Sequence, residues 1–145
     1  MYEDTWRIFR EHPWTGTGLG TLIAVYPRYQ SFYNGTTVDH AHNDFLELLA
    51  DTGLVGGLCG ALFIGLLFRR GFANLQVAAG GSARALIVGP LVACAGLLLH
   101  GSVDFNLHIP SNALIFILLA SLATIRTSEP SPFTPDRLPA FQEAC

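Results

Sequence analysis

Three apolar runs in the later part of the chain constrain its fold more than any other feature. The first covers residues 45–68 and carries no charged side chain from residue 52 onward. The second covers residues 85–103, and the third covers residues 109–125. A helix that crosses a lipid bilayer needs about 20 predominantly apolar residues. Each run approaches that length, so the sequence predicts an all-α fold with three transmembrane helices.

The alternative is a buried helical hairpin in a soluble protein, and the composition argues against it. Only 13% of the 145 residues are charged, against about 25% in typical soluble domains. Little polar surface would remain to cover three such runs. In the first run, Gly53–Gly57 and Gly56–Gly60 have the small-xxx-small spacing that lets helices approach closely in lipid. We therefore expect a fragment of an integral membrane helical bundle.

The chain has no lysine, and its arginines set the expected orientation. Arg69, Arg70 and Arg84 flank the loop between the first two runs, and Arg126 and Arg137 follow the third. Because cytoplasmic loops are enriched in arginine and lysine, both regions should be cytoplasmic. The N-terminal segment and the turn before the third run should then face the periplasm or the cell exterior.

This orientation divides the chain into three parts. We expect residues 1–44 to be a periplasmic loop segment with a short helix and a glycine-rich turn, and residues 45–126 to be a three-span transmembrane domain. Residues 127–145 are rich in Pro, Ser and Thr and predict a disordered cytoplasmic tail. The polar start lacks the apolar stretch of a signal peptide. An outer loop without an export signal leads us to expect that upstream membrane spans are missing from this chain.

Charge and cysteine content narrow the expected partners. The formal charge is −3 and no basic patch is evident, so nucleic acid is not an expected partner. The apolar runs make membrane lipids expected partners. Cys59 and Cys94 lie inside apolar runs, Cys145 is the last residue, and no C-x-x-C pair exists. The cysteines therefore predict neither a metal framework nor a disulfide, and are interpreted as small buried residues.

The first 15 residues predict a short amphipathic helix that ends before Pro13. Gly16, Gly18 and Gly20 follow it. No strand precedes these glycines and no Walker lysine follows them, so a nucleotide-binding loop is rejected. A tight turn at the membrane surface is the favoured interpretation. Contact between its backbone N–H groups and a phosphate is the alternative.

An aromatic, turn-rich segment continues the predicted outer surface over residues 26–35. Such residues anchor proteins at the membrane interface, and they also suit contact with a carbohydrate or a lipid carrier. Arg28 is the cation of this segment and is a candidate for pairing with a phosphate.

Ionisable residues gather where the first apolar run begins, within residues 39–56. Such residues in a membrane segment are costly and usually mark function. A helix that starts near Asn43 would be capped by Asn43 or Asp44 and would place Glu47 and Asp51 on one face. Any of the three acidic residues could then orient the ring of His42.

Three interpretations of the histidines stay open on spacing alone. His42 is a candidate general base, because imidazole titrates near neutral pH and accepts a proton from a sugar hydroxyl. Alternatively, His40 and His42 bind a metal together with Asp39 or Asp44. In the third interpretation, the histidines are polar residues at the membrane interface without a chemical role.

Three segments in order resemble the O-antigen ligase and O-antigen polymerase family. His42-Asn43, nine residues, and then Gly53-Leu54-Val55-Gly56 are similar to its H[NSQ]-x9-G-x-x-[GTY] signature. The loop from Pro13 to Gly20 resembles its P-x-x-G-x-G-x-G loop, and Asp104 to Asn112 resembles the segment before its final helix. The resemblance covers roughly residues 10–125.

The resemblance implies a multi-pass helical bundle in the bacterial inner membrane and a glycan transfer without a metal or other cofactor. Ligases of this family move a glycan from undecaprenyl diphosphate to a lipid A–core sugar, and polymerases extend a repeat-unit glycan. Carried over, His42 would deprotonate the acceptor hydroxyl, supported by Asn43, Glu47 and Asp51. The remaining candidates are substrate-binding residues (Arg28, His40, Asp104, Asn106 and His108) and glycines of structural motifs (Gly16, Gly18, Gly20, Gly53 and Gly56).

The chain departs from the family in one respect. Family members hold the carrier diphosphate with arginines from earlier loops, which are absent here, and Arg28 matches none of them. We therefore expect a C-terminal fragment that is inactive alone and that an upstream chain with the missing spans could complement. A non-catalytic membrane remnant or scaffold is the alternative function, and a metal-handling protein is the third.

Overall fold

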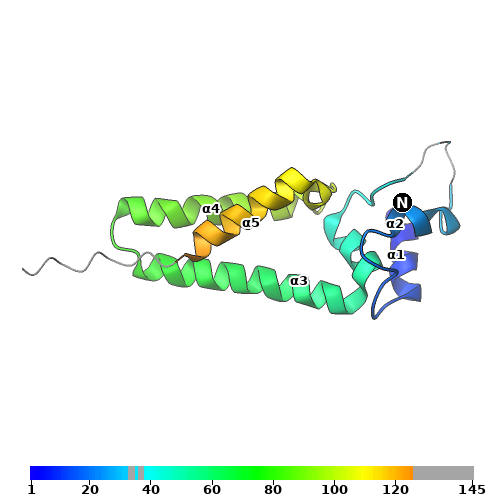
Figure 1. The fold of residues 1–145 in the computed structure, drawn as a ribbon, viewed down its shortest axis with the longest axis horizontal. Coiled ribbons are helices and arrows are strands. Elements are labelled where there is room, and N and C mark those ends of the chain that lie inside the picture. The colour runs from blue at the N-terminus through cyan, green and yellow to red at the C-terminus, as the bar shows by residue number, and fades with distance from the viewer. Residues whose placement is uncertain (33–34, 36–37, 126–145) are drawn as a thin grey trace, which may run out of the picture.

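The computed structural model describes residues 1–32, 35 and 38–125. Its α-helices are α1 (Tyr2–Glu11), α2 (Leu22–Val25), α3 (Asp44–Val77), α4 (Gly81–His100) and α5 (Pro110–Thr124). Two 3-10 helices, η1 (Tyr26–Arg28) and η2 (Asn106–His108), lie between them (Figure 1). No strand occurs among the described residues, which confirms the predicted all-α fold. The expected C-terminal tail, with Arg126, Arg137 and Cys145, lies outside them.

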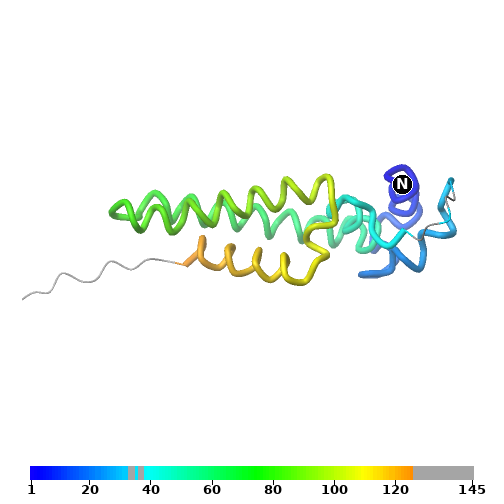
Figure 2. The backbone as a smooth tube through the Cα atoms, turned by 90° about the horizontal axis from the view of Figure 1, so that it is seen from above, coloured from blue at the N-terminus to red at the C-terminus, as the bar shows by residue number. Residues whose placement is uncertain are grey.

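The three long helices form an elongated bundle. Helices α3 and α4 run antiparallel, and α5 lies alongside both (Figures 1 and 2). Two of them, α3 and α4, are long and apolar enough to cross a membrane, and α5 is a shorter apolar helix. Helix α3 continues beyond the predicted apolar run, residues 45–68, and ends at Val77. Residues 78–80 then reverse the chain into α4.

A narrow core holds the three helices together. Its buried side chains come from α3 (Leu67), α4 (Ile87, Leu91, Cys94) and α5 (Phe116, Ala120, Ala123). Near the end of α3, the Asn74 amide donates hydrogen bonds to the carbonyls of Ala123 and Ile125 at 3.3 and 3.2 Å. These bonds satisfy carbonyls that the end of α5 leaves without helical partners.

Much of the remaining surface of these helices is apolar and exposed. Leu58, Leu62, Leu86 and Val92 are each more than 60% exposed, which suits helix faces in contact with lipid or with further helices. Cys94 is buried as predicted, whereas Cys59 is exposed.

Close helix approach occurs at a different glycine from those predicted. A side chain at Gly57 or Gly60 would meet leucines of α3 itself, so the predicted small-xxx-small spacing does not mark a helix contact here. A side chain at Gly71 would instead meet Leu91 of α4. The contact lies near the α3–α4 turn because the two helices are joined by only three residues.

The N-terminal segment packs as a small separate layer against the start of α3 (Figure 1). Helix α1 is amphipathic and ends before Pro13, as predicted. Its buried Ile8 joins Leu22, Tyr26, Ala41 and Ala50 in a second core. The Tyr26 hydroxyl donates to Oδ2 of Asp4 at 3.0 Å, which ties η1 to α1.

The glycine-rich loop braces a break in α3. Gly53 has φ 65° and ψ −161°, so it interrupts the helix. The N–H groups of Leu54 and Val55 donate instead to the carbonyls of Pro13 and Trp14, at 2.8 and 3.2 Å. The loop thereby replaces the intrahelical partners that the break removes.

N–H groups of the glycine-rich loop in turn donate hydrogen bonds to α3. The N–H groups of Thr17 and Gly18 donate to the carbonyls of Ala50 and Asp51, at 3.1 and 2.8 Å. The Gly20 N–H donates to Oδ2 of Asp51 at 2.6 Å. The N–H groups of Thr17, Gly18 and Gly20 are therefore paired within the chain, which favours the predicted tight turn over contact with a phosphate.

Candidate functional site

Three segments meet at the start of α3. The approach to this helix, residues 39–43, lies against the helix's first two turns and against the connection between α4 and α5. The segments are far apart in sequence, and the structure brings together six predicted site residues there: His40, His42, Asn43, Glu47, Asp104 and His108.

Asn43 builds the corner that joins these segments. It is the N-cap of α3, as predicted, and its Oδ1 accepts the Leu46 N–H at 2.9 Å. Its amide nitrogen donates to the carbonyl of Ser102 at 2.8 Å. The next N–H, from Asp44, donates to the carbonyl of Gly101 at 2.7 Å. This clasp fixes the α4–α5 connection to the first turn of α3.

The ring of His42 pairs with Asp104, not with the predicted carboxylates of α3. Its Nδ1 lies 3.1 Å from Oδ1 of Asp104, and its edge packs on Phe105 with ring centroids 4.9 Å apart. Nearly half of the His42 side chain is exposed. An imidazole that donates from Nδ1 to a carboxylate keeps Nε2 free to accept a proton.

The backbone at His42 is unusual. Its φ is 51°, the left-handed region that non-glycine residues rarely occupy. The hydroxyl of Tyr2 donates to its carbonyl at 2.8 Å. Strained residues of this kind persist only where their surroundings hold them, and they cluster at functional sites.

Asp104 is well suited to hold the His42 ring as an ionised acceptor. The backbone N–H of Phe105 donates to its Oδ1 at 2.9 Å. That hydrogen bond, together with the contact from His42, holds the pKa of the Asp104 carboxyl below its usual value.

A second histidine cluster lies beside the first, around the buried carboxylate of Glu47. Oε1 of Glu47 lies 2.9 Å from Nδ1 of His40 and 3.4 Å from Nε2 of His108. The other ring nitrogen of His108 lies 2.7 Å from Oδ1 of Asp44. The His40 ring stacks on the Phe105 ring, and the His42 ring also contacts Phe105. His40 and His42 thus have different carboxylate partners.

The remaining predicted site residues lie elsewhere or have internal partners. Asp51 is buried and accepts from the glycine loop, so it does not orient His42. Asn106 is buried, and its Oδ1 accepts from the Asn112 amide at 2.6 Å. Arg28 is exposed at the end of η1 and forms no ion pair within the part of the chain that the structure describes.

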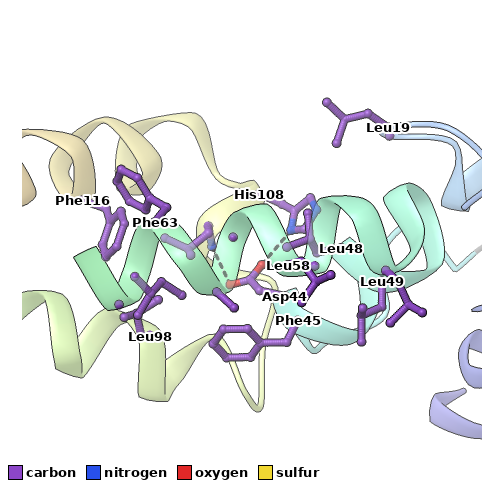
Figure 3. Close-up of a pocket in the computed structure, with 18 residues that line it drawn as sticks. Leu19, Asp44, Phe45, Leu48, Leu49, Leu58, Phe63, Leu98, His108 and Phe116 are labelled. Atoms are coloured by element: carbon purple, nitrogen blue, oxygen red, sulfur yellow. Dashed lines mark hydrogen bonds and ion pairs between the residues drawn. The ribbon is translucent and has the colours of Figure 1, made fainter. Parts of the chain in front are cut away.

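An apolar groove of about 1010 Å³ opens beside the second cluster. Side chains of α3, α4 and α5 line it, among them Leu48, Leu58, Phe63, Leu98 and Phe116. Asp44 and His108, which point toward one another, are its ionisable lining residues (Figure 3). The groove is thus a long apolar surface with a polar patch, the shape of site that suits an amphipathic molecule.

Sequence reasoning missed the pairing of His42 with Asp104, the cluster around Glu47 and the groove. The only available signal was that the connection near residues 102–108 should lie on the same side of the membrane as the histidines. Spacing along one helix does not report contacts between residues that are more than 60 positions apart.

Comparison with known proteins gives one match. Residues 1–61 match the family model described as O-Antigen ligase, which confirms the family resemblance. The match includes the glycine loop, His42 and the Gly53–Gly56 motif. The third resembling segment, from Asp104 to Asn112, lies beyond the matched residues and stays a prediction. The chain matches no curated protein and no solved structure.

Proposed function

We propose that this membrane protein, a relative of the O-antigen ligases over residues 1–61, supplies the acceptor-activating part of a glycosyl-transfer site. The observation that carries the proposal is the pairing of His42 with Asp104, at 3.1 Å. An apolar groove opens at the neighbouring cluster, where Asp44 and His108 line it. The donor would be a glycan on undecaprenyl diphosphate. The acceptor would be a hydroxyl of another glycan or of a lipid A–core.

In the proposed reaction, Nε2 of His42 takes the proton of the acceptor hydroxyl. The acceptor oxygen forms a bond to the anomeric carbon of the donor sugar, and the bond from that carbon to the lipid diphosphate breaks. The electron pair of that bond leaves with the diphosphate. Asp104 stabilises the imidazolium that forms and keeps its Nε2 facing the acceptor.

The groove supports a lipid-borne donor, whose apolar chain would lie along its leucines and phenylalanines. Its polar patch carries the Asp44 carboxylate, however, and no arginine pairs with that carboxylate among the described residues. A diphosphate placed there requires added cations. This supports our expectation that an upstream chain completes the site with its own arginines.

The test is glycan transfer in cells that express this chain together with the upstream spans. His42→Ala should lower transfer by roughly 10²–10⁴-fold, the usual contribution of a general base. Asp104→Asn should also lower transfer, because the amide cannot balance the charge of an imidazolium. The matched control is His12→Ala, which removes an exposed imidazole away from the site.

Membrane insertion of each variant is checked by fractionation, so that loss of the protein is not mistaken for loss of chemistry. Transfer retained at the wild-type rate by an inserted His42→Ala variant would remove the base assignment.

A further inference from the structure

We propose that His40, Glu47 and His108 form a binding site for a divalent transition-metal ion, with zinc as the preferred ion. The three residues each offer one ligand atom, and these atoms lie within 4.8 Å of one another. The site is separate from His42, and the proposal does not depend on the glycosyl transfer proposed above.

Two of the three spacings between ligand atoms are close to those around a tetrahedral ion, and the third, between His40 and His108, is within 4.8 Å. Zinc binds histidine nitrogen at about 2.0–2.1 Å, so neighbouring ligand atoms lie roughly 3.4 Å apart. The Glu47 oxygen lies 2.9 Å from the His40 nitrogen and 3.4 Å from the His108 nitrogen. Small movements of three side chains would therefore suffice to close them around an ion.

Each ligand is held in place by an outer contact, as in established metal sites. Nδ1 of His108 faces Asp44 at 2.7 Å, which directs Nε2 toward the cluster. Oε2 of Glu47 accepts the backbone N–H of Ala41 at 2.7 Å, which leaves Oε1 for an ion. The His40 ring stacks on Phe105, with centroids 4.7 Å apart.

The charges around the cluster also favour a cation. Asp44 and Glu47 are buried, at 5% and 1% exposure, and no arginine pairs with either one among residues 1–32 and 38–125. Two buried carboxylates so close together need positive charge. A metal ion between His40, Glu47 and His108 would supply that charge.

The donor set selects the class of ion. Two imidazole nitrogens and one carboxylate oxygen suit zinc or a similar transition metal, whereas magnesium and calcium prefer oxygen ligands. Such an ion would cross-link residue 40, the second turn of α3 and the α4–α5 connection. Its role would be to hold these segments together, since the family resemblance implies a transfer reaction that needs no metal.

The test is metal binding by the purified full chain in detergent micelles. After treatment with a chelator and its removal, Co²⁺ is added and its visible absorption is followed, and Zn²⁺ is then used to displace it. We expect stoichiometric binding with the absorption of a tetrahedral nitrogen and oxygen site. Glu47→Gln and His108→Gln should abolish the signal, and Asp44→Asn should weaken affinity by about 10–100-fold.

Two control variants distinguish this site from metal binding elsewhere on the chain. His42→Gln should bind Co²⁺ like the wild type, because its ring pairs with Asp104, whereas a site built on His40 and His42 would lose binding. His12→Gln controls for adventitious binding to exposed histidines. Circular dichroism identifies any variant that fails to fold; where Glu47→Gln does so, His108→Gln and His40→Gln carry the test.

Stoichiometric binding that is lost in the folded cluster variants and kept in both controls supports the proposal. Absence of stoichiometric binding in the folded wild-type chain overturns it, and the cluster is then a hydrogen-bonded network of histidines and carboxylates. Loss of binding in His42→Gln with retention in His108→Gln overturns it as well.

Discussion

At the scale of single residues, Gly53 and Gly56 are needed for different structural reasons. Gly53 has a positive φ, which disfavours any other residue, and it lies directly against the backbone of Trp14, which leaves no room for a side chain. Gly56 is helical and would meet Thr52 of its own helix. The sequence motif predicts that these glycines matter, but it does not show that the first one breaks the helix.

Gly53→Ala should therefore destabilise the chain by at least about 1–3 kcal/mol, the usual cost of a strained backbone, with a further cost for displacing the loop at Trp14. Gly65→Ala is the matched control, because Gly65 lies in the same helix with open space around it. Thermal unfolding in detergent, followed by circular dichroism, measures both. Equal unfolding midpoints for the two variants would show that the loop does not depend on the break.

The surroundings of His42 were predictable only in part. Its motif identifies the residue, and the cap at Asn43 follows from the residue type. Its partner Asp104 does not follow, because 62 residues separate the pair and only the fold of α4 back onto α3 closes that distance.

At the scale of elements, apolar length predicted the helices well, because lipid-facing helices need little else. The packing of η1 against α1 was not predictable, because it depends on a buried hydrogen bond between Tyr26 and Asp4, which are 22 residues apart. Burial and the neighbouring Asp4 carboxylate raise the pKa of Tyr26 to about 12. Burial opposes ionisation of Asp4, but hydrogen bonds from Ser31 and Tyr26 outweigh it and lower the pKa of that carboxyl.

This pair predicts alkaline weakening of the N-terminal layer. The folded chain holds the Tyr26 proton more tightly than the unfolded chain, whose tyrosine pKa is about 10. The stability from this group is thus complete below pH 10 and is lost as the pH rises toward 12, by up to ~3 kcal/mol.

The measurement is the unfolding midpoint of the wild type and of Tyr26→Phe across this pH range. The variant should be less stable at neutral pH, because Asp4 loses a hydrogen-bond donor, and the gap should narrow as the pH rises above 10. A gap that stays constant up to pH 12 would contradict the assigned cause.

At the scale of the whole molecule, the structure shows an all-α protein with two helices able to span a membrane, but the orientation rests on the arginines. We predict that Val103→Cys, in the exposed α4–α5 connection, reacts with an impermeant maleimide added to intact spheroplasts. Ala79→Cys, in the α3–α4 turn, should react only after the membrane is permeabilised. Both are placed in a background without Cys59, Cys94 and Cys145, and the reverse pattern would invert the topology.

The clasp between α3 and the α4–α5 connection has a mechanical consequence. Asn43 and Asp44 donate hydrogen bonds to the carbonyls of Ser102 and Gly101. His42 directly precedes Asn43, and Asp104 lies two residues after Ser102. When the helices tilt against each other in a fluid bilayer, the imidazole and its carboxylate therefore travel as one rigid unit. The distance between them should stay constant through motions that reshape the groove beside them.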